Sequence, residues 1–171
     1  MAIREHETTM AEVERTDDNL YERDFVAWLD HQVSALRERR FADLDLDNLI
    51  EEVETLRRTE QRSVEHHARV VVSQMLLLAH STLADPRRCW KATAHVHRHE
   101  LEMRLTPTLR QALDARLGEV YERGREDAAT VLETEGTDES RLPRGCPYTL
   151  DEILEENWFP TNIYGFDRLE A

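Results

Sequence analysis

The stretch that decides the fold is residues 46–80, LDNLIEEVETLRRTEQRSVEHHARVVVSQMLLLAH. Its apolar residues recur at steps of three and four, which is the period of one face of an α-helix. The chain has no proline and no glycine before Pro86, so its first half lacks the residues that usually end helices. We therefore predict a long helix over about 45–80, either continuous or kinked near 59–62.

A second helix is expected before this stretch, over about 17–40, with Asp17 or Asp18 as its N-cap. Another helix should begin near residue 87, because the Asp85-Pro86 pair before it breaks the helical pattern. It should end before Thr106.

Two more helices follow in the second half of the chain. Thr106 and Pro107 form a cap and a first helical position, which predicts a helix from there to Gly136. Gly124, inside this helix, marks either a weak point or a close helix crossing. A capping box at 149–152, TLDE, begins a short helix that ends near residue 157. No stretch has the alternation of a strand, so the predicted fold is all-α, with about five helices in an irregular bundle.

The domain organisation is predicted from length and composition. A chain of 171 residues fits one domain, which we place at 17–160, after a flexible acidic lead-in over 1–16. The aromatic C-terminal tail over 161–171 should dock on that domain. The chain shows neither a signal-peptide core nor an apolar run long enough for a membrane span, so we expect a cytoplasmic protein with no membrane partner and with Cys89 and Cys146 as free thiols.

Charge is distributed unevenly along the chain. The net charge is −14, which argues against nucleic-acid binding, since affinity for phosphates comes from Lys and Arg. Residues 61–110 nevertheless contain 8 bases and 4 acids, and six of the eight histidines. An anion site, if the protein has one, belongs in this central block. The alternative is that the acidic flanks neutralise it within the fold.

The central block suggests two candidate sites. His95 and His99, four residues apart on one helix face, could join His67 in a three-histidine metal site. Packing or solvent-facing histidines are the alternative, and the chain has no HExxH or Glu-x-x-His pattern, so no metal and no cofactor are predicted. The PRRCW segment at 86–90 places two arginines at a helix start, where a phosphate or carboxylate can bind. Otherwise these arginines pair with acids while Trp90 packs in the core.

Four strings resemble the bacterial family catalogued as domain of unknown function 29: LYERDFVAWL from residue 20, RRFADLDLDNLIEEVETLRRTEQR from 39, AHSTLADPRRCWKAT from 79 and CPYTLDEIL from 146. The resemblance implies a compact α-helical protein and implies no reaction. The positions of its motifs that could hold function are Asp24, Trp28, Glu51, Glu52, Arg58, Arg62, Trp90 and Tyr148. Their spread fits either buried ion pairs or a polar pocket.

We therefore expect a non-enzymatic helical interaction protein of the bacterial cytoplasm, acting on a protein partner or as a homo-oligomer such as a dimer. The alternative is a metal-dependent or anion-binding enzyme that uses the central block of His and Arg, so enzymatic activity is left open. The candidate pocket residues are Asp24, Glu52, Arg58, Arg87, Arg88, Trp90 and Arg98.

Overall fold

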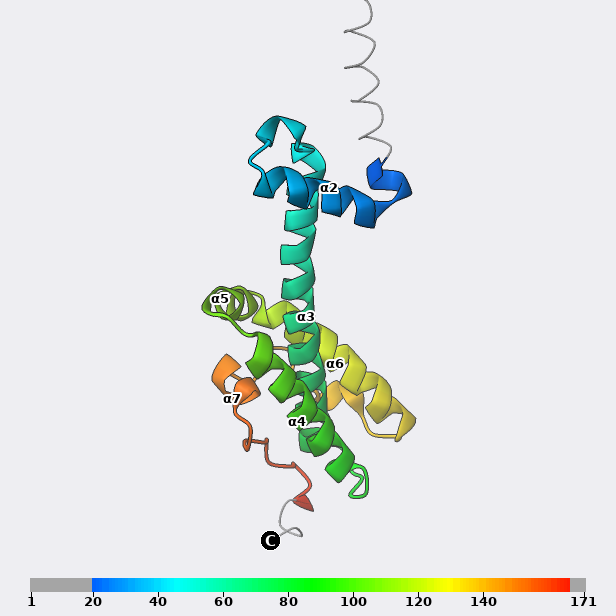
Figure 1. Cartoon of the computed structure of the whole chain (residues 1–171). Helices are drawn as coiled ribbons and strands as arrows, with labels where there is room; N and C mark the ends of the chain where they lie inside the picture. The colour runs from blue at the N-terminus through cyan, green and yellow to red at the C-terminus, as the bar shows by residue number, and fades with distance from the viewer. Residues whose placement is uncertain (1–19, 167–171) are drawn as a thin grey trace, which may run out of the picture. The chain divides into compact units, whose positions relative to one another are not determined.

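A computed structural model describes residues 20–166, with the side chain of Glu139 left out, and contains no strand in that range (Figure 1). The predicted all-α class is confirmed. The elements are α2 (Phe25–Arg37), η1 (Phe41–Asp43), α3 (Leu46–His80), α4 (Arg87–Arg104), α5 (Pro107–Ala115), α6 (Leu117–Thr134), η2 (Glu139–Arg141) and α7 (Leu150–Leu154).

The contacts of the chain divide at Arg57 into two compact units, which we describe separately. We call residues 20–57 the N-terminal unit and residues 58–166 the C-terminal unit. The long helix predicted over 45–80 is present as α3, a single helix of 35 residues. The lead-in over 1–16 and residues 167–171 of the tail lie outside the described residues, and the single domain over 17–160 stays a prediction.

In the N-terminal unit, the helix predicted over 17–40 is interrupted at Asp24. Residues 20–23 are helical, and α2 begins only at Phe25, because the Asp24 side chain accepts a hydrogen bond from the Ala27 amide at 3.0 Å. A carboxylate in this position caps a new helix instead of continuing the previous one. The predicted caps, Asp17 and Asp18, lie outside the described residues. The helix ends at Arg37, and Arg39 turns the chain with a φ of 56°.

Polar bonds fasten α2 to the start of α3. Trp28, Gln32 and Ala35 are the buried residues of α2. The Trp28 indole donates to the Asp45 carboxylate at 3.1 Å, and the Gln32 side-chain oxygen accepts from the Asp45 amide at 2.9 Å. Asp45 therefore holds two buried side chains of α2 at the point where α3 begins.

The core lies in the C-terminal unit. The second part of α3 buries a nearly continuous run of side chains, against which α4, α6 and α7 pack (Figure 1). α4 contributes Trp90 and Leu101, α6 contributes Tyr121 and Leu132, and α7 contributes Ile153. A helix that is apolar on more than one face needs neighbours on more than one side, and α3 has them here.

Gly124 marks a close helix crossing. A Cβ atom at this position would lie 2.9 Å from the Arg69 carbonyl oxygen and 2.9 Å from Val72 Cγ1 on α3. The predicted helix from 107 to 136 is wrong in one respect: it is broken at Arg116 into α5 and α6. The break redirects the chain, so that Leu113 and Val120 both reach the core.

The C-terminal segment is anchored to α3 and α4. The capping box of Thr149 and Glu152 is present, but α7 ends at Leu154, earlier than the predicted end near 157. Beyond it, the Asn162 side chain donates to the carbonyls of Leu78 and Ser81 at 2.8 and 3.1 Å. These bonds hold Asn162 at the end of α3, and the docking of the whole tail over 161–171 stays a prediction.

Candidate functional site

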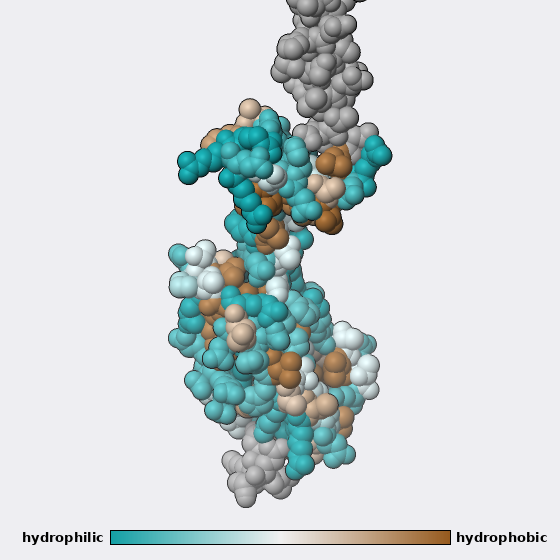
Figure 2. Space-filling model, viewed as in Figure 1, coloured by the Kyte–Doolittle hydropathy of each residue, from teal (hydrophilic) through white to brown (hydrophobic). Residues whose placement is uncertain are grey.

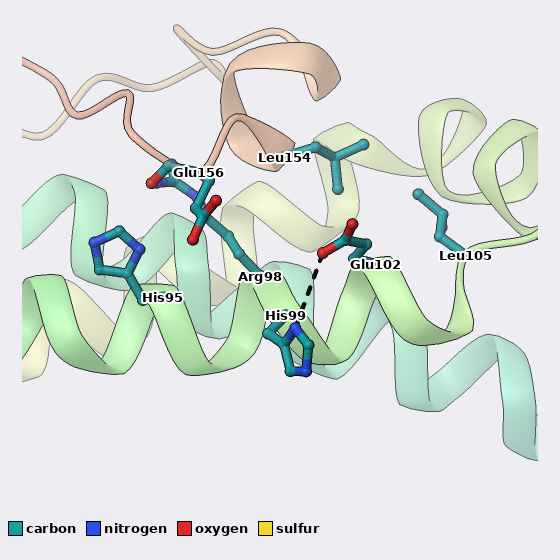
Figure 3. Close-up of a pocket in the computed structure, with 7 residues that line it drawn as sticks. All are labelled: His95, Arg98, His99, Glu102, Leu105, Leu154 and Glu156. Atoms are coloured by element: carbon teal, nitrogen blue, oxygen red, sulfur yellow. Dashed lines mark hydrogen bonds and ion pairs between the residues drawn. The ribbon is translucent and has the colours of Figure 1, made fainter.

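A pocket of the C-terminal unit lies between α4 and the α7 segment and has a volume of about 370 Å³ (Figure 3). We call it the α4–α7 pocket. Positions 95, 98, 99 and 102 fall on one face of α4, because residues three and four apart are neighbours on a helix surface. The lining side chains are His95, Arg98, His99, Glu102, Leu105, Leu154 and Glu156.

Arg98 is a structural residue of this pocket. Its side chain is buried, with 4% of the residue exposed, and it donates to the carbonyl oxygens of Ile153 at 2.9 Å, Glu156 at 3.0 Å and Glu152 at 3.2 Å. These carbonyls lie in and beyond the last turn of α7, which a cation stabilises. Burial lowers the pKa of Arg98 to about 10, so the guanidinium stays charged at neutral pH. The N–H donors of the Arg98 guanidinium therefore bind the backbone of the α7 segment.

The other polar side chains of the pocket are two imidazoles and two carboxylates. His99 Nδ1 lies 3.9 Å from a Glu102 carboxylate oxygen, and the His95 ring packs edge-on against Phe159 with 5.3 Å between ring centroids. In Figure 3, Glu156 lies above α4 close to Arg98. The pocket therefore combines imidazoles, carboxylates and two leucines without one dominant charge.

The structure separates the three histidines of the alternative metal site. His95 and His99 line the α4–α7 pocket, whereas His67 Nδ1 lies 2.9 Å from His97 Nδ1. The His66 ring lies beside both, with centroids 5.4 and 5.9 Å away. Within residues 20–166, no group of three His, Cys, Asp or Glu side chains is placed to hold a metal ion.

The pKa values of His67 and His97 are both lowered. The pKa of His67 is lowered by burial and by the neighbouring His97 and His66, and the pKa of His97 is lowered by burial and by His66. A bond between two Nδ1 atoms requires one donor and one acceptor, so at least one ring of the pair is neutral. Protonating both rings removes the bond.

The two arginines at the start of α4, Arg87 and Arg88, do not form a shared anion site. Arg87 is 2% exposed and donates to the Leu78 carbonyl near the end of α3 at 2.7 Å. Trp90 is a core residue, as the alternative predicted, while the Arg88 side chain is exposed. The two arginines therefore lie in different environments, and neither lines the α4–α7 pocket.

The candidates of the N-terminal unit also have structural contacts. Asp24 caps α2, and Glu52 accepts a 2.5 Å hydrogen bond from the Tyr21 hydroxyl. That bond, with the nearby carboxylates, raises the pKa of Tyr21 to about 12. Arg58 is the first residue of the C-terminal unit and is exposed, and Tyr148 is buried in the core.

The N-terminal unit also has an exposed apolar surface, which the predicted site residues do not include (Figure 2). Large side chains recur on α2 and on the first turns of α3 at helical spacing, yet each is at least 41% exposed. The only sequence signal is the length of the apolar stripe of α3. We call this set the N-terminal apolar face: Phe25, Val26, Val33, Leu36, Leu46, Ile50, Val53 and Leu56.

A second missed feature is a small pocket of about 100 Å³ between α3 and α6. We call it the α3–α6 pocket. Three of its side chains are arginines, one on α6 and two on α3, and its lining is Arg62, Glu65, His66, Arg69, Val120 and Arg123. The sequence spacing of Arg62, His66 and Arg69 predicts that they share one helix face. It does not show that α6 lies opposite this face, so the pocket could not be predicted from the sequence.

The helices that the structure describes include none that is both long enough and apolar enough to cross a membrane. No curated protein and no solved structure matches the chain. The family described as Domain of unknown function DUF29 matches residues 20–159, which is most of the chain and includes the four strings on which the resemblance depended. On this match, the chain belongs to the family Domain of unknown function DUF29.

Proposed function

We propose that this protein is a helical interaction protein that assembles through its N-terminal apolar face, and that its partner is a second copy of the chain. The observation that carries the proposal is the imbalance of the N-terminal unit. Two of the three buried residues of α2, Trp28 and Ala35, are apolar, whereas nine large apolar side chains of the unit are exposed: the eight of the N-terminal apolar face and Phe41. Large exposed apolar side chains gathered on one part of a protein mark interaction sites.

The arrangement of the face supports a helical partner. On α2, Phe25, Val33 and Leu36 follow the helical period, and on α3 Leu46, Ile50 and Val53 do the same. Apolar stripes of this kind on α2 and on the first turns of α3 are surfaces onto which the helices of another chain can pack. A second copy supplies helices with the same chemistry, in a self-complementary interface.

The energetics are adequate for a stable contact. Fully burying one large apolar side chain contributes about 1.5–3 kcal/mol, and several such side chains exceed the lower estimates of the cost of association, about 4 kcal/mol. The opposing term is charge, because each copy carries a net charge of −14. Salt screens this repulsion, so self-association should become tighter as ionic strength rises.

Size-exclusion chromatography with light scattering tests the proposal over a range of protein concentrations. We expect the mass to rise from the 20.1 kDa of one chain towards twice that value, and to rise at lower concentration when salt is added. A mass that stays at one chain throughout contradicts self-association. Tighter association at low salt instead indicates contact between opposite charges.

Matched variants locate the contact. Ile50→Ser with Val53→Ser removes the centre of the N-terminal apolar face, and Val96→Ser with Met103→Ser removes two side chains of α4 that are similarly exposed, at 61% and 71%. The first pair should weaken the dimer about 100-fold, as expected for a loss of about 3 kcal/mol, and the second should leave it unchanged. Equal effects of the two pairs contradict the proposed interface.

A further inference from the structure

We infer that the α3–α6 pocket binds an oxyanion of the phosphate class, held by Arg62 and Arg123 with His66 beside them. The site is independent of the proposed assembly, which uses residues of the N-terminal unit. Some of the charges around the pocket are paired within the fold, and others are not.

Two ion pairs between α3 and α6 accompany this pocket. Arg69 makes a bidentate pair with Asp127, with two N–O distances of 2.6 Å. Glu65, which is buried with 6% of the residue exposed, pairs with Arg116. Together with the close crossing at Gly124, these pairs fix the spacing of the two helices.

The carboxylate that lines the pocket, Glu65, and the carboxylate that pairs with the lining residue Arg69 are therefore already occupied. Both oxygens of Asp127 accept from Arg69, and Glu65 Oε1 also accepts from the Gln61 side chain at 3.0 Å. On α6, Glu119 pairs with Arg116 at 2.7 Å and Glu122 with Arg125 at 3.0 Å.

Arg62 and Arg123 take no part in these ion pairs. Neither makes a hydrogen bond or an ion pair within the part of the chain that the structure describes, although the charge of Arg123 contributes to lowering the pKa of Glu119. One arginine comes from α3 and the other from α6, and both line the same pocket. The His66 ring adds a further nitrogen that can donate. Among the residues that line the pocket, the unpaired charges are therefore positive, although the charge of Glu126 also acts on Arg69.

Size and donor type select the class of ligand. A volume of about 100 Å³ admits a small tetrahedral anion or the terminal phosphate of a larger molecule. Guanidinium groups present planar pairs of N–H donors that match the oxygens of phosphate, and such charge-assisted bonds are stronger than neutral ones. The negative charge of the whole chain weakens the attraction, so the specificity must come from these local donors.

The test is isothermal titration of the full chain with inorganic phosphate, at constant ionic strength maintained with chloride. Arg62→Gln with Arg123→Gln removes the unpaired donors. Arg88→Gln with Arg144→Gln removes the same total charge from exposed positions elsewhere. We expect phosphate to bind, the first pair to weaken binding at least 10-fold and the second pair to leave it unchanged.

Two further titrations test the roles of the guanidinium groups and the identity of the anion. The conservative pair Arg62→Lys with Arg123→Lys keeps the charge and loses the planar forks, so it should retain only part of the affinity, and circular dichroism checks that every variant is folded. Glycerol phosphate, titrated in the same way, distinguishes a terminal phosphate group, which binds as well as the free ion, from a site that accepts inorganic phosphate alone. Absence of phosphate binding at millimolar concentration, or equal losses in the two Gln pairs, overturns the inference.

Discussion

The two ends of α3 have the same helical period and opposite environments. In the N-terminal unit its apolar residues Leu46, Ile50 and Val53 are 57–64% exposed, whereas in the C-terminal unit Val71, Met75 and Leu78 are fully buried. Both sets follow the spacing of a single helix face. The difference shows that the period of a helix identifies an apolar face but does not identify what covers it.

The units also differ in how they use polar groups. The N-terminal unit joins α2 to α3 through Asp45, which accepts from the Trp28 indole and donates its amide to Gln32. The C-terminal unit buries arginines, and Arg87 and Arg98 both donate to backbone carbonyls near helix ends. A buried guanidinium with several carbonyl partners fixes segments that apolar contacts alone leave free to slide.

The largest expected effect is a loss of stability in a variant of the buried end of α3, measured beside a variant of the exposed end. Leu76→Ala should destabilise the protein by about 2–5 kcal/mol, because Leu76 is fully buried and its removal leaves a cavity. Ile50→Ala, at a position that is 58% exposed, should change stability by less than about 0.5 kcal/mol in the monomeric chain. Urea unfolding at low protein concentration measures both. A similar loss in the two variants would show that the N-terminal apolar face is covered in the monomer.

The second prediction concerns the buried arginine of α4. Arg98→Met keeps much of the side-chain volume but leaves the carbonyls of Glu152, Ile153 and Glu156 without their donor. We expect a loss of about 1–3 kcal/mol, the cost of buried acceptors that lose their partner. Arg88→Met, on an exposed part of the same helix, is the control and should cost less than about 0.5 kcal/mol. Equal stabilities would contradict an anchoring role for Arg98.

The third prediction tests the close crossing in the C-terminal unit. Gly124→Ala should destabilise by about 1–3 kcal/mol, because the added Cβ meets the Arg69 carbonyl and the Val72 side chain. Gly118→Ala, in the same helix but with no atom within 4 Å of the added Cβ, should stabilise the protein by about 0.5–1 kcal/mol. Thermal unfolding of the two variants, measured side by side, should therefore give shifts of opposite sign.

The smallest expected effect is a dependence of stability on pH. His67 and His97 have lowered pKa values in the folded protein, chiefly because they are buried, so the unfolded chain binds more protons near their ordinary pKa of about 6.5. Their contribution is therefore fully present above that pH and is lost as the pH falls through it. The melting temperature should decrease on acidification.

A variant of this pair identifies the groups responsible. His67→Gln removes one titrating ring of the pair, so the melting temperature should fall less steeply with acidification than in the unmodified chain. His99→Gln is the control, because the His99 side chain is 69% exposed. A pH dependence that the His67 variant leaves intact would assign the effect to other groups.

The sequence predicted the helices and their ends where the signal is local. The Thr106-Pro107 start and the capping box at Thr149 depend on residues within one turn of the boundary, and both are present. The interruption at Asp24 and the break at Arg116 were missed, because an apolar stripe can continue across a change in chain direction.

The sequence predicted which candidate side chains share a helix face, but not which side chains of another helix they meet. Residues that share one helix face were placed correctly relative to each other, since His95 and His99 line one pocket and His97 does not. Contacts between helices were not, because His67 meets His97 across α3 and α4 and the partners of Arg98 come from the α7 segment. Spacing within one helix cannot show which residue of another helix lies opposite.

By itself the sequence determined that this protein is all-α, that α3 extends from about residue 45 to 80, and that the central block is rich in arginine and histidine. Those properties follow from periodicity, capping and composition, which act over a few neighbouring residues. The tertiary structure decided which charges are paired, which carbonyls the buried arginines hold and which part of the α3 stripe is covered. These outcomes depend on residues that are distant in the chain, such as Arg69 and Asp127, and packing alone brings them together.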